Sequence, residues 1–138
     1  MKEILFRGKV ADEPNEWVYG SLVNDDTIFQ RKAHDGSKAC DMGMFKVDPE
    51  TVGQFTGLSD KSGKKIFEGD IVKEWSIHWK TPLKTEINIY EVVCENLGSL
   101  HLIRKTEYGE TSTLLYRKSV VVVIGNIFDN PELLEEKQ

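Results

Sequence analysis

The chain has 138 residues and a formal net charge of -5 at pH 7. This length suits one domain, or two very small barrels that share a core. A hydrophobic content of 39%, with three Trp, four Tyr and six Phe, excludes a disordered chain. The negative charge argues against a protein that coats nucleic acid by bulk electrostatics. The sequence shows neither a membrane span nor a signal peptide, so we expect a cytoplasmic protein.

The first part of the chain reads as short strands joined by turns. We expect a strand at 4–6 and two more at 17–23 and 27–30, which the turn Asn24-Asp25-Asp26 joins into a hairpin. The polar segment 32–38 contains Asp35-Gly36 and is predicted to be a loop.

The central stretch holds the densest group of turn signals. Asp48-Pro49-Glu50 predicts a helix start, because it places an N-cap acceptor, a proline and an acid in the favoured order. A hairpin should follow, with strands at 54–58 and 64–67 around the turn Asp60-Lys61-Ser62-Gly63. The next tight turn is Glu68-Gly69-Asp70, after which the chain enters another strand.

The second half is also predicted to be strands. Two-residue alternation puts one set of apolar residues on a single face of the strand that begins at Ile71, and we expect that face to be the core: Trp75, Ile77 and Trp79. In the strand 86–94 the expected inward residues are Ile87, Ile89 and Val93. The segment 120–124 is apolar throughout and is predicted to be a central strand covered on both faces.

Asn130-Pro131-Glu132 repeats the helix-start pattern of Asp48-Pro49-Glu50, so a short helix or a frayed tail should close the chain. Many short strands at close spacing, with helices only as caps, are typical of a barrel or a sandwich. The expected fold class is therefore mainly β, with one or two short helices.

Three motifs resemble the YopX family of small bacteriophage and prophage proteins. They are the opening K-E-I-L-F-R-G, the central V-D-P-E-T-V-G-Q-F with T-G-L-S-D-K-S-G-K-K-I-F-E-G-D-I-V, and the late I-G-N-I-F-D-N-P-E-L-L. The resemblance implies one all-β domain over 1–138 of small SH3-like barrel type, built either as a single barrel or as two barrel subdomains meeting near 47–73. It implies no catalytic residues, since the family has no established biochemical role.

Metal and cofactor chemistry has little support in the sequence. The three histidines stand at no metal-ligand spacing: His34, His78 and His101. Asp60, Glu68 and Asp70 could converge on a cation, but the simpler interpretation is that each serves its own turn. Cys40 and Cys94 are expected to be reduced, small buried or half-buried residues. We therefore predict no catalytic residues, no metal and no cofactor.

A ribonuclease is the third hypothesis for function. The segment Gly69-Asp70-Ile71-Val72 also occurs in small barrels, including toxin ribonucleases of the PemK type. A metal-free ribonuclease would need an acid, a base and a cation at the phosphate, and Asp70, His78 and Arg104 could supply them.

A basic and aromatic segment is the candidate binding surface. Residues 61–84 carry six Lys against Glu68, Asp70 and Glu74, a net charge of +3, whereas 129–138 has a net charge of -3. The surface would consist of Lys61, Lys64, Lys65, Lys73, Trp75, His78 and Trp79. Its tryptophans could stack on single-stranded bases, but their alternation favours core packing.

These patterns predict a non-enzymatic phage or prophage accessory protein that binds a host or phage protein and self-associates. A nucleic-acid-binding small barrel is the alternative. An exposed Trp pair among lysines would favour nucleic acid, and a buried pair would favour protein.

Overall fold

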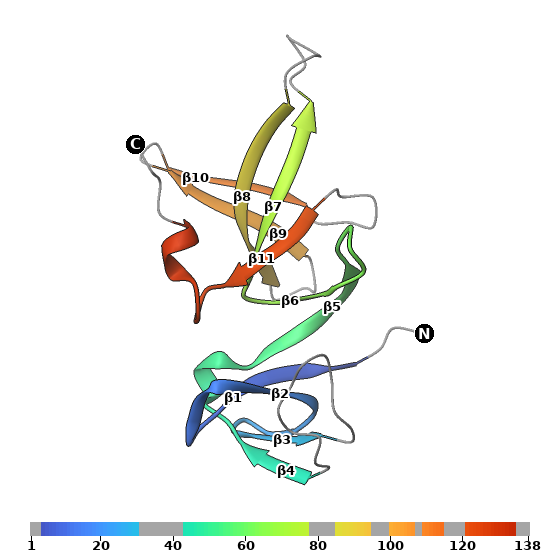
Figure 1. Cartoon of the computed structure of the whole chain (residues 1–138), viewed down its shortest axis with the longest axis vertical. Coiled ribbons are helices and arrows are strands. Elements are labelled where there is room, and N and C mark those ends of the chain that lie inside the picture. The colour runs from blue at the N-terminus through green and yellow to red at the C-terminus, as the bar shows by residue number, and fades with distance from the viewer. Residues whose placement is uncertain are drawn as a thin grey trace. The chain divides into compact units, whose positions relative to one another are not determined.

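The computed structural model describes residues 4–30, 43–77, 85–94, 100–106, 109–114 and 121–134. It divides into two compact units, Met1–Gly57 and Leu58–Gln138. The described part of the chain is mainly β, and its two short helices are single 3-10 turns (Figure 1). The predicted fold class is confirmed.

The first unit is a small antiparallel sheet. Its strands are β1 (Phe6–Val10), β2 (Glu13–Asn24), β3 (Thr27–Gln30), β4 (Gly43–Lys46) and β5 (Gly53–Ser59), the last of which crosses the boundary between the units. The order of hydrogen-bonded strands is β4-β3-β2-β1-β5-β6, where β6 is Lys65–Phe67. The predicted β2–β3 and β5–β6 hairpins are both present.

The chain after β4 returns to the far end of β1 and closes the first unit. Val47 forms a bridge with Val10. On either side of it, the Ala11 N–H donates to the Lys46 carbonyl and the Asp48 N–H to the Lys9 carbonyl, both at 2.9 Å. This closure gives the strands a common interior, as in a small barrel. The core of the unit is formed by Val18, Ile28 and Val47, with Phe6, Val10, Leu22, Phe45 and Val52 packed against them.

The helix start predicted at Asp48 is the 3-10 helix η1 (Pro49–Thr51). The Asp48 carboxylate caps it by accepting from the Glu50 N–H at 3.1 Å. Buried Thr51 joins the helix to β1, because its Oγ1 donates to the Asp48 carbonyl at 2.6 Å and accepts from the Lys9 N–H at 2.9 Å.

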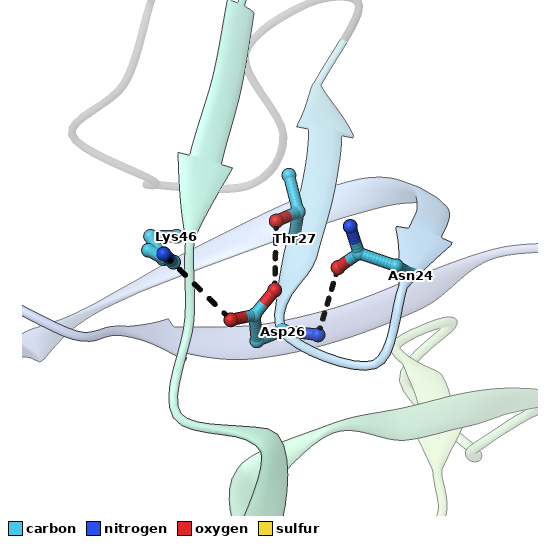
Figure 2. A network of polar contacts seen from close by, with 4 residues as sticks. All are labelled: Asn24, Asp26, Thr27 and Lys46. Carbon is cyan, nitrogen blue, oxygen red and sulfur yellow. Dashed lines mark hydrogen bonds and ion pairs between the residues drawn. The ribbon is translucent and has the colours of Figure 1, made fainter.

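The β2–β3 turn is held by short polar contacts (Figure 2). The Asn24 Oδ1 accepts from the Asp26 N–H at 3.1 Å, and the Asp26 carboxylate accepts from the Thr27 hydroxyl at 3.0 Å. Lys46 of β4 forms an ion pair with Asp26 at 3.9 Å. Because Lys46 is largely exposed, this pair contributes little stability.

The second unit has the same strand order as the first. Besides β6, which lies within this unit, its strands are β7 (Asp70–Ile77), β8 (Thr85–Cys94), β9 (Leu100–Thr106), β10 (Gly109–Leu114) and β11 (Val121–Asn126), and these five form a sheet in the order β10-β9-β8-β7-β11. In each unit four strands form a meander, and a fifth strand pairs with the first. The two 3-10 turns do not correspond in this pattern, since η1 precedes β5 and η2 (Pro131–Leu134) follows β11.

The core of the second unit lies on the opposite face of the sheet from the one predicted. It contains Ile66, Val72, Tyr90, Val92, Leu102 and Val121, with Leu58 and Val123 packed against it. Ile87, which was expected to point inward, is 54% exposed, and half-buried Trp75 belongs to neither core. Both faces of β7 and β8 carry apolar residues, so alternation alone does not select the buried face. Ile77 has no described side chain, and Trp79 lies outside the described residues.

The prediction that 120–124 forms a central strand is also wrong. β11 begins at Val121 and stands at the end of the hydrogen-bonded order. Val121 is buried, whereas the following residues of the strand are half-buried. An apolar run can occupy a sheet edge when another segment covers that edge.

Candidate functional site

The segment that covers the edge of β11 is the turn between β5 and β6. The Asp60 carboxylate, only 8% exposed, accepts from the N–H groups of Ser62 at 2.8 Å and Lys64 at 2.9 Å. Its second oxygen accepts from the Val123 N–H of β11 at 3.0 Å. Gly63 completes the turn with φ +88°, a conformation that a residue with a Cβ rarely adopts. Asp60 therefore both shapes the turn and attaches it to β11.

The same turn presents two lysines of the predicted binding surface. The Lys61 N–H donates to the Val121 carbonyl at 3.0 Å, which places Lys61 directly beside β11. The side chains of Lys61 and Lys64 are exposed, and that of Lys65 is half-buried at the start of β6. Since β11 pairs with β7, the turn lies about two strand spacings, roughly 10 Å, from β7.

The second predicted turn, at Gly69, is fixed by Asp70. Asp70 is 1% exposed, and its Oδ2 accepts from the Phe67 N–H at 2.7 Å. Gly69 has φ +90°; its N–H donates to the Val92 carbonyl at 3.0 Å, and its carbonyl accepts from the Ile127 N–H at 2.9 Å. These bonds join the turn to β8 and to the segment after β11.

Two of the three acids considered for metal binding, Asp60 and Asp70, are thus engaged with the backbone, and the third, Glu68, is half-buried in the Gly69 turn. Asp60 and Asp70 each hold a turn, as the simpler interpretation predicted. In the described ranges, no group of three or more His, Cys, Asp or Glu side chains is placed to hold a metal ion. Asp70, the acid of the ribonuclease hypothesis, is buried and accepts from a backbone N–H. His78, its supposed partner in a ribonuclease, lies outside the described residues, as does the side chain of Arg104.

The surface with the most unusual composition is the non-core face of β7 and β8. Strand register places one set of side chains on it, here called the outer sheet face: Lys73, Trp75, Ile87, Ile89, Glu91 and Val122. Between β7 and β8, Trp75 pairs with Ile87, Lys73 pairs with Ile89 and Ile71 pairs with Glu91. Between β7 and β11, Lys73 pairs with Val122. Ile71 also lies on this side of β7 and is fully buried, so the face is covered at that end and is most exposed at Ile87. Apolar side chains therefore dominate the face.

Lys73 and Trp75 form the best defined contact on the outer sheet face. The Lys73 Nζ lies 5.8 Å from the centroid of the Trp75 ring, within the range of a cation–π interaction. Both side chains are half-buried. Of the predicted binding surface, the structure thus brings Lys73 and Trp75 together and places Lys61 and Lys64 on the nearby turn. His78 and Trp79 lie outside the described residues.

Glu74 occupies the other face of β7, between Val121 and Asn88 in the register. Burial raises the pKa of the Glu74 carboxyl above its ordinary value. This face belongs to the core, where Val72 and Val121 are fully buried. The negative charge of Glu74 is therefore directed away from Lys73.

A second basic and aromatic cluster lies in the first unit, and sequence reasoning missed it. The guanidinium carbon of Arg7 lies 4.8 Å from the centroid of the Trp17 ring, and the Lys9 Nζ lies 5.7 Å from it. The register of the β1–β2 hairpin brings them together, since Lys9 pairs with Trp17 and Arg7 with Tyr19. The sequence gives no direct signal for this pairing, because the register shifts between Lys9 and Val10: Val10 pairs with Glu13, but Lys9 pairs with Trp17. Because Arg7 is buried, we assign this cluster to packing.

The late motif I-G-N-I-F-D-N forms a closed corner after β11. The Asn126 Oδ1 accepts from the N–H groups of Phe128 at 3.0 Å and Asp129 at 2.9 Å. The Asn130 Oδ1 in turn accepts from the Asn126 N–H at 3.2 Å. The residues of the longest sequence motifs thus form three turns: the Asp60 turn, the Gly69 turn and this corner. Of the predicted binding surface, Lys61, Lys64 and Lys65 lie within the central motif, and Lys73 and Trp75 follow it directly.

These features define a small, mainly β protein in which each unit has a four-strand meander and a further strand paired with the meander's first strand, with an aromatic and basic outer sheet face in the second unit. The chain belongs to the YopX family, described as "YopX protein", whose sequence profile matches residues 5–135. Among solved structures it is similar to protein EF1440 from Enterococcus faecalis, with 25% identity and a TM-score of 0.47 over 98% of this chain and 100% of that chain.

A comparison with curated proteins gives no significant match. Within the described ranges, no helix has the length and apolar character needed to cross a bilayer.

Proposed function

We propose that this protein is a non-enzymatic protein-binding module and that its contact surface is the outer sheet face. The observation that carries the proposal is the Trp75–Ile87 pair, in which a 54% exposed isoleucine lies beside a half-buried tryptophan. Tryptophan is enriched at the energetic centres of protein interfaces, and exposed clusters of large apolar side chains mark contact sites. The buried, hydrogen-bonded Asp60 and Asp70 support a structural role for the acids.

The biological setting of the proposal comes from the family resemblance. We propose a phage or prophage accessory protein that acts in the host cytoplasm, binds a host or phage protein and self-associates. A net charge of -5 favours a protein partner over general coating of nucleic acid.

Binding of single-stranded nucleic acid is the second candidate. It is favoured by the contact between Lys73 and Trp75 and by the exposed Lys61 and Lys64 on the neighbouring turn. Such a surface would bind with a strong dependence on salt concentration.

A tagged pull-down from host lysate, with and without nuclease, tests the proposal. Wild type is compared with Ile87→Arg and with Met44→Arg, a matched control at a 65% exposed apolar position of the first unit. We expect one protein partner that persists after nuclease treatment, is lost with Ile87→Arg and is retained with Met44→Arg. Recovery that disappears with nuclease would support nucleic-acid binding instead.

A further inference from the structure

The β7–β8 hairpin continues past its neighbours in the sheet. β11 pairs with β7 over Asp70–Glu74, and β9 pairs with β8 over Glu91–Cys94. β7 and β8 remain paired with each other as far as Ile77 and Thr85. Figure 1 shows the ends of β7 and β8 extending past β9 and β11. In the register, the Trp75–Ile87 pair lies one step beyond Glu74–Val121, the last pair of β7 with β11 in the described part of the chain.

Such a two-stranded end gains little stability from its own two strands. Its apolar pair is therefore well placed for a partner's side chain to cover. A contact there would remove Ile87 and the rest of Trp75 from water, which favours association.

The charges around the Trp75–Ile87 pair are unevenly placed. Lys73 lies two residues before Trp75 on β7, and its ammonium lies over the Trp75 ring. Lys61 and Lys64 are exposed on the turn beside β11. Glu74 lies on the core face of β7. Glu91, the acid of the outer sheet face, is four residues from Ile87 on β8, about 13 Å along the strand. Among the described residues, the charged side chains beside the apolar pair on this face and on the neighbouring turn are thus cations, on a protein with a net negative charge.

We propose that the outer sheet face binds an acidic protein segment that carries one aromatic or large aliphatic side chain. The apolar side chain would pack on Trp75 and Ile87, and the flanking carboxylates would pair with Lys73 and with the lysines of the Asp60 turn. This assignment rests on the proposed function and specifies its partner. Opposite charges at such a rim select partners and speed association more than they raise affinity.

Peptide selection tests the assignment without presupposing the sequence of the partner. A random 12-residue peptide display library is selected against the whole protein, with counter-selection against the Ile87→Arg variant. We expect the selected peptides to be enriched in Asp and Glu around an aromatic or aliphatic residue. Their binding should fall at least tenfold with Lys73→Glu, but should not change with Lys46→Glu, a charge reversal at an exposed lysine of the first unit.

Other results separate this inference from the proposed function. Selected peptides that are neutral or basic but still need Ile87 would overturn the acidic partner and leave the binding face in place. Selection that yields no peptide dependent on Ile87 would overturn both. Tighter binding of a labelled 12-nucleotide oligo(dT), lost with Lys73→Glu, would assign the surface to nucleic acid and refute the inference.

Discussion

Replacing Asp60 by alanine should destabilise the second unit more than the loss of an ordinary turn residue. The carboxylate accepts three backbone N–H groups, two within its turn and one from Val123 of β11. A hydrogen bond to a charged group contributes about 1.5–3 kcal/mol, but water can replace the carboxylate at the exposed turn amides. We therefore expect a loss of roughly 2–4 kcal/mol in the free energy of unfolding.

The matched control is Asp48→Ala, which removes an exposed aspartate that accepts one backbone N–H at 3.1 Å. Loss of such a cap costs about 0.5–2 kcal/mol. Urea denaturation followed by circular dichroism gives both values, and hydrogen exchange should show faster exchange of the Val123 amide in Asp60→Ala. A smaller loss for Asp60→Ala than for Asp48→Ala, or an unchanged Val123 amide, would refute the reasoning.

Three further perturbations test other parts of the structure. Gly20→Ala should lower the free energy of unfolding by at least 1–3 kcal/mol, because a Cβ there would lie 2.0 Å from the Phe29 carbonyl oxygen. In the control Gly43→Ala, the added Cβ meets no atom within 4 Å, so urea denaturation should show a nearly unchanged stability. Gly125→Ala should lower the free energy of unfolding by about 1–2 kcal/mol, since its Cβ would displace the Asn130 Oδ1 from the Asn126 N–H. A melting temperature equal to that of the wild type would contradict this. Glu74 has a raised pKa in the folded state, so its contribution to stability is present at low pH and is lost as the pH rises from about 4.5 through the raised value. Glu74→Gln should therefore be more stable than wild type at pH 7 and show a flatter pH profile, and a less stable variant at pH 7 would contradict the assigned burial.

The sequence was informative where a local residue type fixes the backbone. Asp48 caps a helical turn, and Asp60 and Gly69 mark their turns, because capping and positive φ depend on neighbours along the chain. The hairpins around these turns could be predicted for the same reason.

The sequence could not decide which face of the β7–β8 hairpin is buried. Ile87 and Ile89 on one side are as apolar as Tyr90 and Val92 on the other, so the choice depends on which segments pack against the sheet. The same limit explains the wrong placement of β11, whose edge is covered by the distant Asp60 turn. It also hid the contact of Arg7 and Lys9 with Trp17, which depends on the hairpin register.

Site-specific photo-crosslinking at position 87 tests the proposed binding face most directly. A benzophenone amino acid is introduced at Ile87 or, as the control, at Met44, and the cells are irradiated during expression together with the host and phage proteins. We predict a discrete protein adduct at position 87, resistant to nuclease, and none at position 44. Absence of an adduct at position 87, or the same adduct at both positions, would contradict a protein-binding outer sheet face.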